Sequence, residues 1–263
     1  MIRALFTAST GMVAQQLNVD TVANNLANVN TTAFKKSRVN FKDLIYETLK
    51  APGSPNSAGE ITPEGVQVGH GVRVGSVAKI FTPGNMISTG TPTDLAIEGE
   101  GFFQLELPDG TTAYTRDGNF KINANGTMVT VDGYILSPTI TVPTDYTSIT
   151  IGNDGVVSVE VPGQTGATEV GTLQLVRFPN PAGLNAKLGR NLLLETEASG
   201  TPVTGEPGVD GVGFLNQGFL ENSNVQVVEE ILNLIIAQRA YEANSRVITT
   251  SDEMLQTANQ IRR

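Results

Sequence analysis

Few side chains in this sequence are placed to do chemistry. His70 is the only histidine among the 263 residues, in the glycine-rich run VGHGV, and the chain has no cysteine. This composition excludes thiolate and histidine-rich zinc sites, and a hydrolase triad would need a nucleophile elbow, which is absent. Glycine neighbours are typical of turns. We therefore predict that His70 lies at the surface or in a turn.

The acidic residues offer three further candidates. Glu98 and Glu100 could be imagined as a glycosidase carboxylate pair, but carboxylates so close in sequence are usually solvated, and the chain has no Trp to bind a sugar. Arg116 beside Asp117 is better explained as an ion pair that anchors a turn. The run DGNFKINANG has the wrong ligand order for a calcium loop, and two hairpin turns explain its glycines. We predict neither an enzyme nor a cofactor or metal site.

The charge balance also limits the partners. Lys and Arg number 17 against 26 Asp and Glu, a formal charge of -9, which disfavours nucleic acid and anionic membranes. No window approaches the ~18 apolar residues of a membrane span. Thr7, Ser9, Thr10 and Gly11 interrupt the apolar N-terminus, so we expect no cleaved signal peptide.

Two helices are predicted at the chain ends. Near the N-terminus Leu5, Met12, Val19 and Leu26 recur every seven residues, with Ala8, Val22 and Val29 three positions further on. Near the C-terminus the same spacing relates Val227, Leu234, Tyr241, Ile248 and Leu255, and Asn222, Ser223 or Asn224 can cap the helix. Such heptads predict a coiled coil made of residues 1–30 and 222–263. Both stripes carry more apolar surface than one partner covers, so we expect further copies to cover the rest.

The middle of the chain has strand patterns. VRVGSVAKI alternates from Val72 to Ile80, and FFQLEL, VVSVEV and TLQLVRF are short runs of β-formers. Four pairs, Asp109-Gly110, Asp117-Gly118, Asn125-Gly126 and Asp132-Gly133, are typical of tight hairpin loops, whose central positions need φ > 0. We predict a meander or small barrel from Asp94 to Leu136 and a second β unit from Ile149 to Phe178. The fold class is then α+β, with a central all-β domain over residues 94–196.

Two Pro- and Gly-rich stretches, Lys50–Gly65 and Glu197–Gly213, separate these parts. They predict a linking domain, residues 31–93 with 197–221, that carries an extended hairpin.

The run VANNLANVNTTAFKK places Asn24, Asn25, Asn28 and Asn30 at the end of the first helix. Amides there can fix how helix, linker and neighbouring copies meet, because a register slip would leave buried amides unpaired at ~1–3 kcal/mol each. Asn28 or Asn30 can also take the left-handed conformation that ends a helix. The alternative is a polar helix end with no role in assembly.

Three segments resemble the bacterial flagellar axial proteins, the rod and hook family. They are the N-terminal motif ANNLAN with TAFK, in which the family commonly has Gly at the position of Ala33; the C-terminal QRAYE, Gln238 to Glu242, with Asn244; and the β region from Thr93 to Leu136. The resemblance covers nearly the whole chain in order. The length and the insertion after Tyr46 are most similar to the distal-rod branch, and the proximal-rod branch is the nearest alternative.

The resemblance implies a structural subunit that leaves the cell through the flagellar export apparatus without a cleaved leader. It would polymerise into a hollow, torque-transmitting tube in the basal body, spanning the periplasm. Implied partners are further copies, a proximal rod protein and the hook protein at the two ends, and the surrounding ring proteins. A more remote alternative is an exported adhesive or glycan-binding β module. The residues predicted to form assembly contacts are Leu5, Met12, Val19, Leu26, Asn24, Asn25, Asn28, Asn30, Phe34, Val227, Leu234, Gln238, Arg239, Tyr241, Asn244, Ile248 and Leu255.

Overall fold

A computed structural model describes residues 2–53, 63–163, 166–209 and 211–261. The chain divides into two compact units. We call them the helical unit, Met1–Ala27 with Ser37–Lys79 and Gln226–Arg263, and the β unit, Asn28–Lys36 with Ile80–Val225. Each unit is built from segments distant in sequence.

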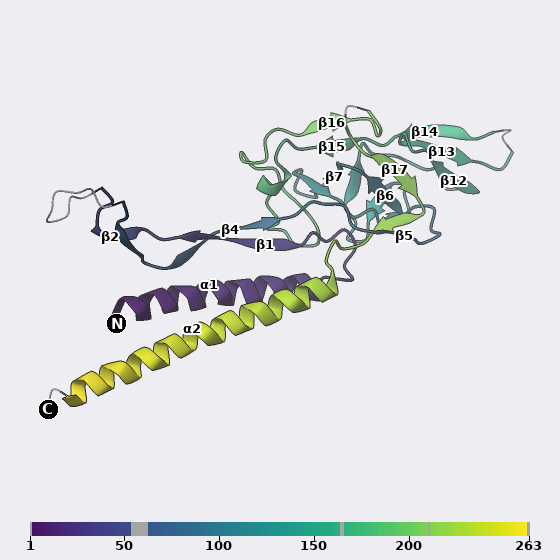
Figure 1. Ribbon diagram of the computed structural model, residues 1–263. Helices are drawn as coiled ribbons and strands as arrows, with labels where there is room; N and C mark the ends of the chain where they lie inside the picture. Colours follow the sequence, from purple (N-terminus) through teal and green to yellow (C-terminus); the bar gives the residue numbers. More distant parts are fainter. Residues whose placement is uncertain (1, 54–62, 164–165, 210, 262–263) are drawn as a thin grey trace. The chain divides into compact units, whose positions relative to one another are not determined.

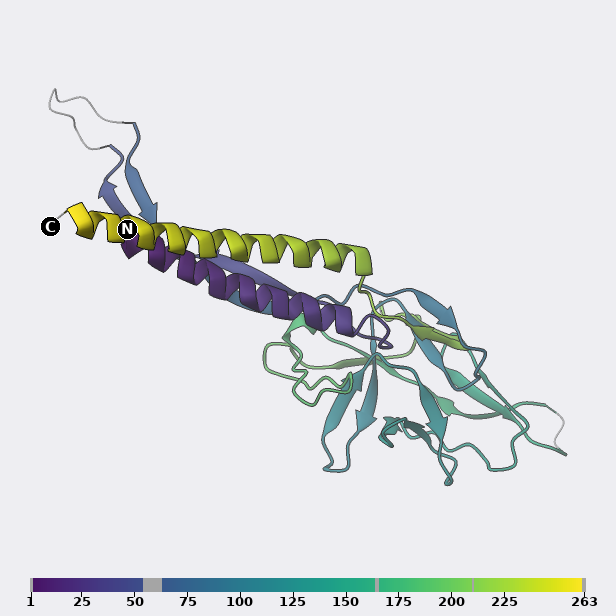
Figure 2. The same ribbon diagram turned by 90° about the horizontal axis from the view of Figure 1, so that it is seen from below.

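Two long helices dominate the helical unit. α1 comprises Ile2–Ala27 and α2 comprises Val227–Ile261. They run antiparallel and side by side (Figures 1 and 2). No Pro or Gly interrupts α2, and Gly11 is the only such residue in α1, which favours long uninterrupted helices. The predicted helix at each end is confirmed, although α1 ends before Asn28 and Asn30.

A β-ribbon packs against α1 in the same unit. β1 (Ser37–Asp43) pairs antiparallel with β4 (Val72–Lys79), and both strands contact α1. β4 is the alternating run predicted from Val72. Beyond this pair, β2 (Tyr46–Lys50) pairs with β3 (Val66–Gly69). β2 and β3 flank the predicted extended hairpin, of which residues 54–62 lie outside the described part of the chain.

The β unit contains one large sheet and several small ones (Figure 1). The large sheet has the order β16-β15-β7-β11-β10-β9, with β8 paired to β7; β12, β13 and β14 form a second sheet, while β17 pairs with β6 and β18 with β5. The described strands do not pair β16 with β9, so the sheet does not close into the predicted small barrel. The mainly β character of the centre is confirmed. The bounds are β5 Met86–Ser88, β6 Leu95–Glu98, β7 Phe102–Glu106, β8 Thr112–Thr115, β9 Phe120–Ile122, β10 Met128–Thr130, β11 Ile135–Ser137, β12 Ser148–Ile151, β13 Val156–Glu160, β14 Thr168–Thr172, β15 Leu175–Arg177, the 3-10 turn Pro181–Gly183, β16 Val203–Gly205, β17 Phe214–Gln217 and β18 Phe219–Glu221.

The core of the β unit is filled by the inward-facing residues of these strands. Phe103 and Phe120 are fully buried, and their ring centroids lie 5.0 Å apart in an edge-to-face arrangement. Leu95 and Ile97 of β6 pack into the same cluster. These strands therefore supply the hydrophobic core of the β unit.

Three of the four predicted hairpin loops form. Gly110, Gly126 and Gly133 have positive φ and connect β7 to β8, β9 to β10 and β10 to β11. Asp117-Gly118 does not make a hairpin, because β8 pairs with β7 whereas β9 pairs with β10. Gly118 is required for a different reason: an added Cβ would collide with the carbonyl of Leu95.

Replacing Gly118 by Ala is therefore expected to destabilise the β unit by about 2–3 kcal/mol, as overpacking of a rigid interior does. Gly110→Ala is the matched control. Its Cβ would meet nothing within 4 Å, and only the left-handed backbone, about 1–2 kcal/mol, opposes it. Denaturant unfolding of both variants measures the difference, and equal losses would contradict the role assigned to Gly118.

Candidate assembly site

The fully buried side chains of α1 and α2 are small or polar. Ala8 and Val22 of α1 and Ala237 of α2 are buried. A Cβ added at Gly11 would lie 2.9 Å from Nδ2 of Asn244, so the absence of a side chain there allows Asn244 to approach α1 closely. Small residues let two helices approach closely but bury little apolar area. Helix pairing alone therefore leaves the larger side chains short of full burial.

Asn25 makes the most specific contact within the helical unit. Its Nδ2 donates to the Ser37 carbonyl at 2.9 Å and to Oε2 of Glu230 at 3.1 Å, and its Oδ1 accepts the Ser37 N–H at 2.9 Å. Asn25 is 2 % exposed and Glu230 is 3 % exposed. One amide thus joins the last turn of α1 to the start of β1 and to the first turn of α2. We call Asn25, Ser37 and Glu230 the Asn25 cluster.

The other predicted assembly residues have graded burial. Phe34 is buried in the β unit, where Asn28 is half-buried and Asn30 is exposed. On the helices the remaining residues divide into a half-buried group and an exposed group. The half-buried group is Leu5, Met12, Val19, Leu26, Leu234, Asn244, Ile248 and Leu255, and the exposed group is Asn24, Val227, Gln238, Arg239 and Tyr241.

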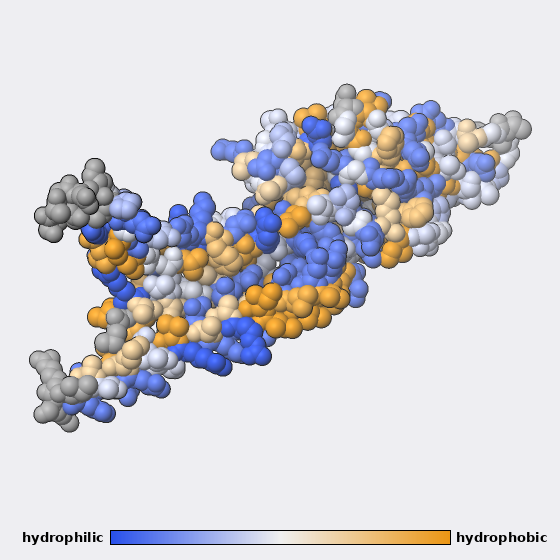
Figure 3. All heavy atoms as spheres, in the orientation of Figure 1, coloured by the Kyte–Doolittle hydropathy of each residue, from blue (hydrophilic) through white to orange (hydrophobic). Residues whose placement is uncertain are grey.

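A large apolar surface lies on the outer face of α2. Val228, Leu232, Ile235 and Ile236, which we call the α2 ridge, are between 48 % and 72 % exposed. Figure 3 shows apolar atoms gathered over the first turns of α2. An apolar patch of this kind is typical of a protein interaction surface.

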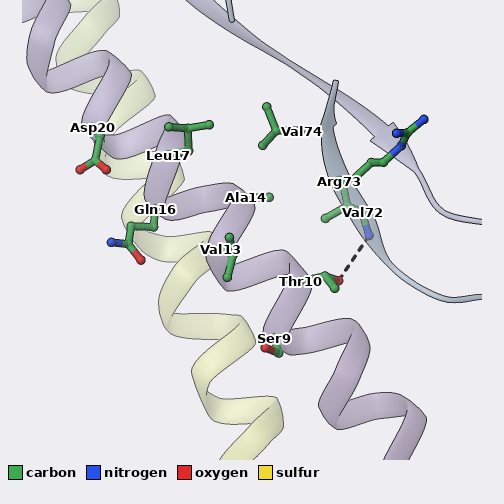
Figure 4. A pocket seen from close by; sticks show the side chains of 10 residues that line it. All are labelled: Ser9, Thr10, Val13, Ala14, Gln16, Leu17, Asp20, Val72, Arg73 and Val74. Atoms are coloured by element: carbon green, nitrogen blue, oxygen red, sulfur yellow. Dashed lines mark hydrogen bonds between the residues drawn. The ribbon is translucent and has the colours of Figure 1, made fainter. Parts of the chain in front are cut away.

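An open groove of about 610 Å³ runs between α1 and β4. Val13 and Leu17 line its helix side and Val72 and Val74 line its strand side (Figure 4). We call these four residues the α1 groove. At one end Oγ1 of Thr10 accepts the Val72 N–H at 3.4 Å, and Asp20 lines the other end.

A buried charged cluster organises the β unit. Oε1 of Glu221 accepts from Nζ of Lys35 at 2.6 Å, and Oε2 accepts from Nε of Arg116 at 2.6 Å. The side chains of these three residues are at most 5 % exposed. Lys35 also donates to the Thr82 carbonyl, and Arg116 donates to the carbonyls of β6 and its following turn. We call Lys35, Arg116 and Glu221 the Glu221 cluster.

Electrostatics keep the Glu221 carboxyl ionised. Burial acts to raise its pKa, but the charges of Arg116 and Lys35, with hydrogen bonds from Lys35 and the Gly84 N–H, outweigh burial and lower that pKa below 4.5. Burial also lowers the pKa of Lys35, against the attraction of Glu221. Lys35 is the last residue of the TAFK motif and Glu221 ends β18, so the cluster ties together, within the β unit, the two chain segments that lead to α1 and α2.

The predicted ion pair between Arg116 and Asp117 is wrong. Adjacent residues point to different sides, and Arg116 points inward to Glu221. Asp117 instead accepts the Asn119 N–H at 3.1 Å and a hydrogen bond from the Thr32 side chain. Burial raises the pKa of Asp117, with smaller contributions from Asp94 and Asp132, although these hydrogen bonds oppose it.

The prediction that Asn28 or Asn30 is left-handed is also wrong. Ala33 takes that conformation, with φ of 55°, and its N–H donates to the Glu221 carbonyl at 2.8 Å. This position is the one at which the chain departs from the Gly of the family motif. Asn224, predicted as a possible helix cap, instead accepts the Lys36 N–H and donates to the Ile80 carbonyl.

Replacing Ala33 by Gly is expected to stabilise the β unit by about 0.5–1 kcal/mol, because Gly has no steric cost at positive φ. Ala113→Gly, at a buried strand position, is the control and should lose stability. Denaturant midpoints compare the two variants, and a loss at Ala33 would show that its Cβ contacts outweigh the backbone strain.

The residues considered above for catalysis lie in turns and at the surface of the described structure. His70 lies in the turn between β3 and β4, partly exposed, as predicted. Glu98 and Glu100 are exposed, and Glu98 accepts from Nδ2 of Asn216. Within the described ranges, no three His, Cys, Asp or Glu side chains gather to hold a metal ion. Neither described helix has the length and apolarity to cross a membrane.

Three residues of the Asn25 and Glu221 clusters were not predicted from the sequence. Arg116 was considered only with Asp117, and Glu221 was not considered at all, since its partners lie 105 and 186 positions away in sequence. Glu230 is not among the residues predicted from the sequence. A signal for Glu230 does exist: it is seven residues before Ala237 and fourteen before Asn244, on the heptad line that faces α1.

Comparison with known proteins shows the class to which this helix pair and β unit belong. Residues 5–35 match the family described as flagella basal body rod protein, residues 96–159 match the D1 domain of flagellar hook protein FlgE/F/G, and residues 216–261 match the C-terminal region of flagellar basal body rod FlgEFG protein. The chain is therefore a bacterial flagellar axial protein.

Comparison with full-length relatives shows which members of the axial family this chain is most similar to along its whole length. The chain is 52 % identical to the flagellar basal-body rod protein FlgG of Borreliella burgdorferi, over the whole of both chains, and 51 % identical to FlgG of Caulobacter vibrioides, over 99 % and 100 %. By contrast, a flagellar hook protein FlgE of Helicobacter mustelae is 45 % identical over only 52 % of this chain and 30 % of its own length. The chain belongs to the flagellar basal-body rod protein family.

Proposed function

We propose that this chain is the structural subunit of the distal segment of the flagellar rod. It polymerises into a hollow tube, with α1 and α2 of each copy forming a coiled coil near the inside. The tube transmits torque from motor to hook and passes exported subunits along its channel. Its location in the basal body, spanning the periplasm, and its export without a cleaved leader follow from the same role.

The observation that carries the proposal is the exposed apolar surface of the helical unit. The α2 ridge and the α1 groove are both open in a single copy. Contiguous exposed apolar surfaces commonly mark protein interaction sites. Contacts between copies would cover them.

The proposed partners follow from the family. They are further copies of the chain, a proximal rod protein and the hook protein at the two ends, the surrounding ring proteins and the export apparatus. Electron microscopy of the purified chain tests self-assembly: we expect tubes above a threshold concentration, and a globular monomer at every concentration would contradict it. Immunolabelling of isolated basal bodies then distinguishes the distal from the proximal segment.

We further propose that the β2–β3 hairpin, in the linking domain of residues 31–93 and 197–221, stiffens the rod by lying on a neighbouring copy. Ile45, Tyr46 and Leu49 are more than half exposed on this hairpin, as a docking surface requires. Deleting residues 52–63 should leave tubes that bend more easily, because the hairpin becomes shorter and its proposed contact with the neighbouring copy becomes smaller. The persistence length of the tubes measures the effect. Unchanged stiffness would contradict the assignment.

A further inference from the structure

The helical unit carries two apolar surfaces that match in length, shape and charge. We infer that the α2 ridge of one copy inserts into the α1 groove of the next copy. This inference deepens the proposed polymerisation and rests on it, since it names the two faces that meet.

The groove is shaped for a helix. Its floor is low because Ala14, which is buried, is small. Figure 4 shows Ala14 on the side of α1 that faces the strand carrying Val72 and Val74, Val13 and Leu17 beside it on α1, and Thr10 bonded to β4 at one end. Val13 is 66 % exposed. Most of the exposed lining of the groove is apolar, although Ser9, Gln16, Asp20 and Arg73 also line it, and the Arg73 side chain points away from α1 in Figure 4.

The ridge is free to enter such a groove. At 100° per residue, Leu232 and Ile236 lie on the side of α2 opposite to Glu230 and Ala237, which face α1. Pairing of α1 with α2 therefore leaves the ridge uncovered. Figure 3 shows an apolar area over the first turns of α2.

The lengths and charges of the two surfaces agree. The stretch of α2 from Val228 to Arg239, which contains the ridge, and the stretch of α1 from Ser9 to Asp20, which contains the helix side of the groove, each span about 16 Å at 1.5 Å per residue. Arg239 follows the ridge on the same side of α2 and is exposed, with only an exposed contact of 3.4 Å to Glu242 that a new partner can replace, and Asp20 ends the groove and is also exposed. Aligning Arg239 with Asp20 places Leu232 over Val13 and Ile236 over Leu17, with the entering α2 parallel to the receiving α1.

A second copy is the occupant that this arrangement favours. Ridge and groove occupy different faces of the same unit, so every copy offers both at once. A contact between two different faces does not close on itself as a symmetric dimer does; repeated, it builds an open helical assembly. Each added copy brings one ridge and one groove, so the stoichiometry is satisfied throughout the polymer.

Disulfide trapping tests the inference, because the natural chain has no cysteine. The full-length variant Val13→Cys with Leu232→Cys is polymerised and oxidised, and Val13→Cys with Val247→Cys is the control on the same helix. Val247 is 45 % exposed and lies beyond the ridge. We expect a ladder of disulfide-linked oligomers from the first pair, at least ten-fold above the control. Tubes without a ladder would overturn the ridge-and-groove contact while leaving the proposed function intact; absence of tubes from the natural chain would overturn both.

Charge reversal in the full-length chain supplies a second, independent test. Asp20→Lys and Arg239→Glu are each expected to raise the threshold concentration for tubes about five-fold, as loss of an exposed pair does. Combining them should restore the threshold. A double variant that is as impaired as the two single effects together would overturn the alignment of Arg239 with Asp20.

Discussion

Replacing Glu221 by Gln is expected to lower the free energy of unfolding of the β unit by about 3–5 kcal/mol, because it leaves two buried cations without their anion. Lys35 and Arg116 both bond to this carboxylate at 2.6 Å. A loss of this size is a large fraction of the 5–15 kcal/mol that is typical of whole domains. Denaturant unfolding followed by the near-ultraviolet signal of the buried Tyr and Phe residues measures it.

Two controls separate the cluster from a general effect of removing charge. Glu98→Gln removes an exposed carboxylate and should change the free energy by less than about 0.5 kcal/mol. Lys35→Met leaves Glu221 paired with Arg116, so its loss should be smaller than that of Glu221→Gln. If Glu221→Gln costs no more than Glu98→Gln, the cluster does not hold the two chain connections.

The pH dependence has a definite sign. The folded-state pKa of Glu221 is lowered below 4.5, so the folded state binds its proton less readily than the unfolded chain does. The stability contributed by this carboxylate is complete above about pH 4.5 and is lost as the pH falls through the folded-state pKa. Asp117, whose pKa is raised, has the opposite effect on stability as the pH falls. Because Asp117 is present in both the natural chain and the Glu221→Gln variant, its effect cancels in the comparison. The natural chain should therefore lose more stability than the variant between pH 5 and pH 3 in parallel unfolding curves.

Replacing Asn25 by Ala is the second change with a large expected effect. It leaves the N–H and the carbonyl of Ser37 and the carboxylate of Glu230 without their amide partner. At about 1–3 kcal/mol for each unsatisfied buried group, the helical unit should lose at least about 3 kcal/mol. Rod assembly and motility should fail, since the ends of α1 and α2 are no longer held in register. Helix content by circular dichroism and tube formation by electron microscopy measure the two effects.

Asn30→Ala is the matched control, because Asn30 belongs to the same motif but is exposed. It should assemble normally. Normal assembly of Asn25→Ala would refute the role of the amides and favour the plain polar helix end. Asn28→Ala should have an intermediate effect, since Asn28 is half-buried and accepts from Oγ1 of Thr31.

Much of the architecture could be predicted from local patterns. The heptad spacing of Leu5 to Leu26 and of Val227 to Leu255 depends only on neighbouring residues, and both helices form. The same holds for three Asx-Gly hairpins. The hairpin predicted at Asp117-Gly118 does not form. Gly118 instead lets the backbone pass close to the carbonyl of Leu95, which lies more than twenty residues away, and the dipeptide alone could not predict this contact.

The candidate site was predictable only in part. The run of four Asn residues at the end of the first helix predicted directional hydrogen bonds, and Asn25 makes them. The groups to which it bonds, Ser37 and Glu230, could not be predicted, because they depend on how distant segments meet. The Glu221 cluster had no local signal, because its charges come from three parts of the chain. At Ala33 a signal did exist: the departure from Gly marks the residue that has positive φ.

The most direct test compares backbone amide hydrogen exchange of the intact chain in dilute solution and in its assembled form. If the faces left open by the α1–α2 pair need sister copies, the amides of both helices should exchange faster in the monomer than those of β6 and β7, which stay protected. On assembly, α1 and α2 should gain protection by several orders of magnitude. Helices fully protected in a dilute chain that never assembles would contradict this account.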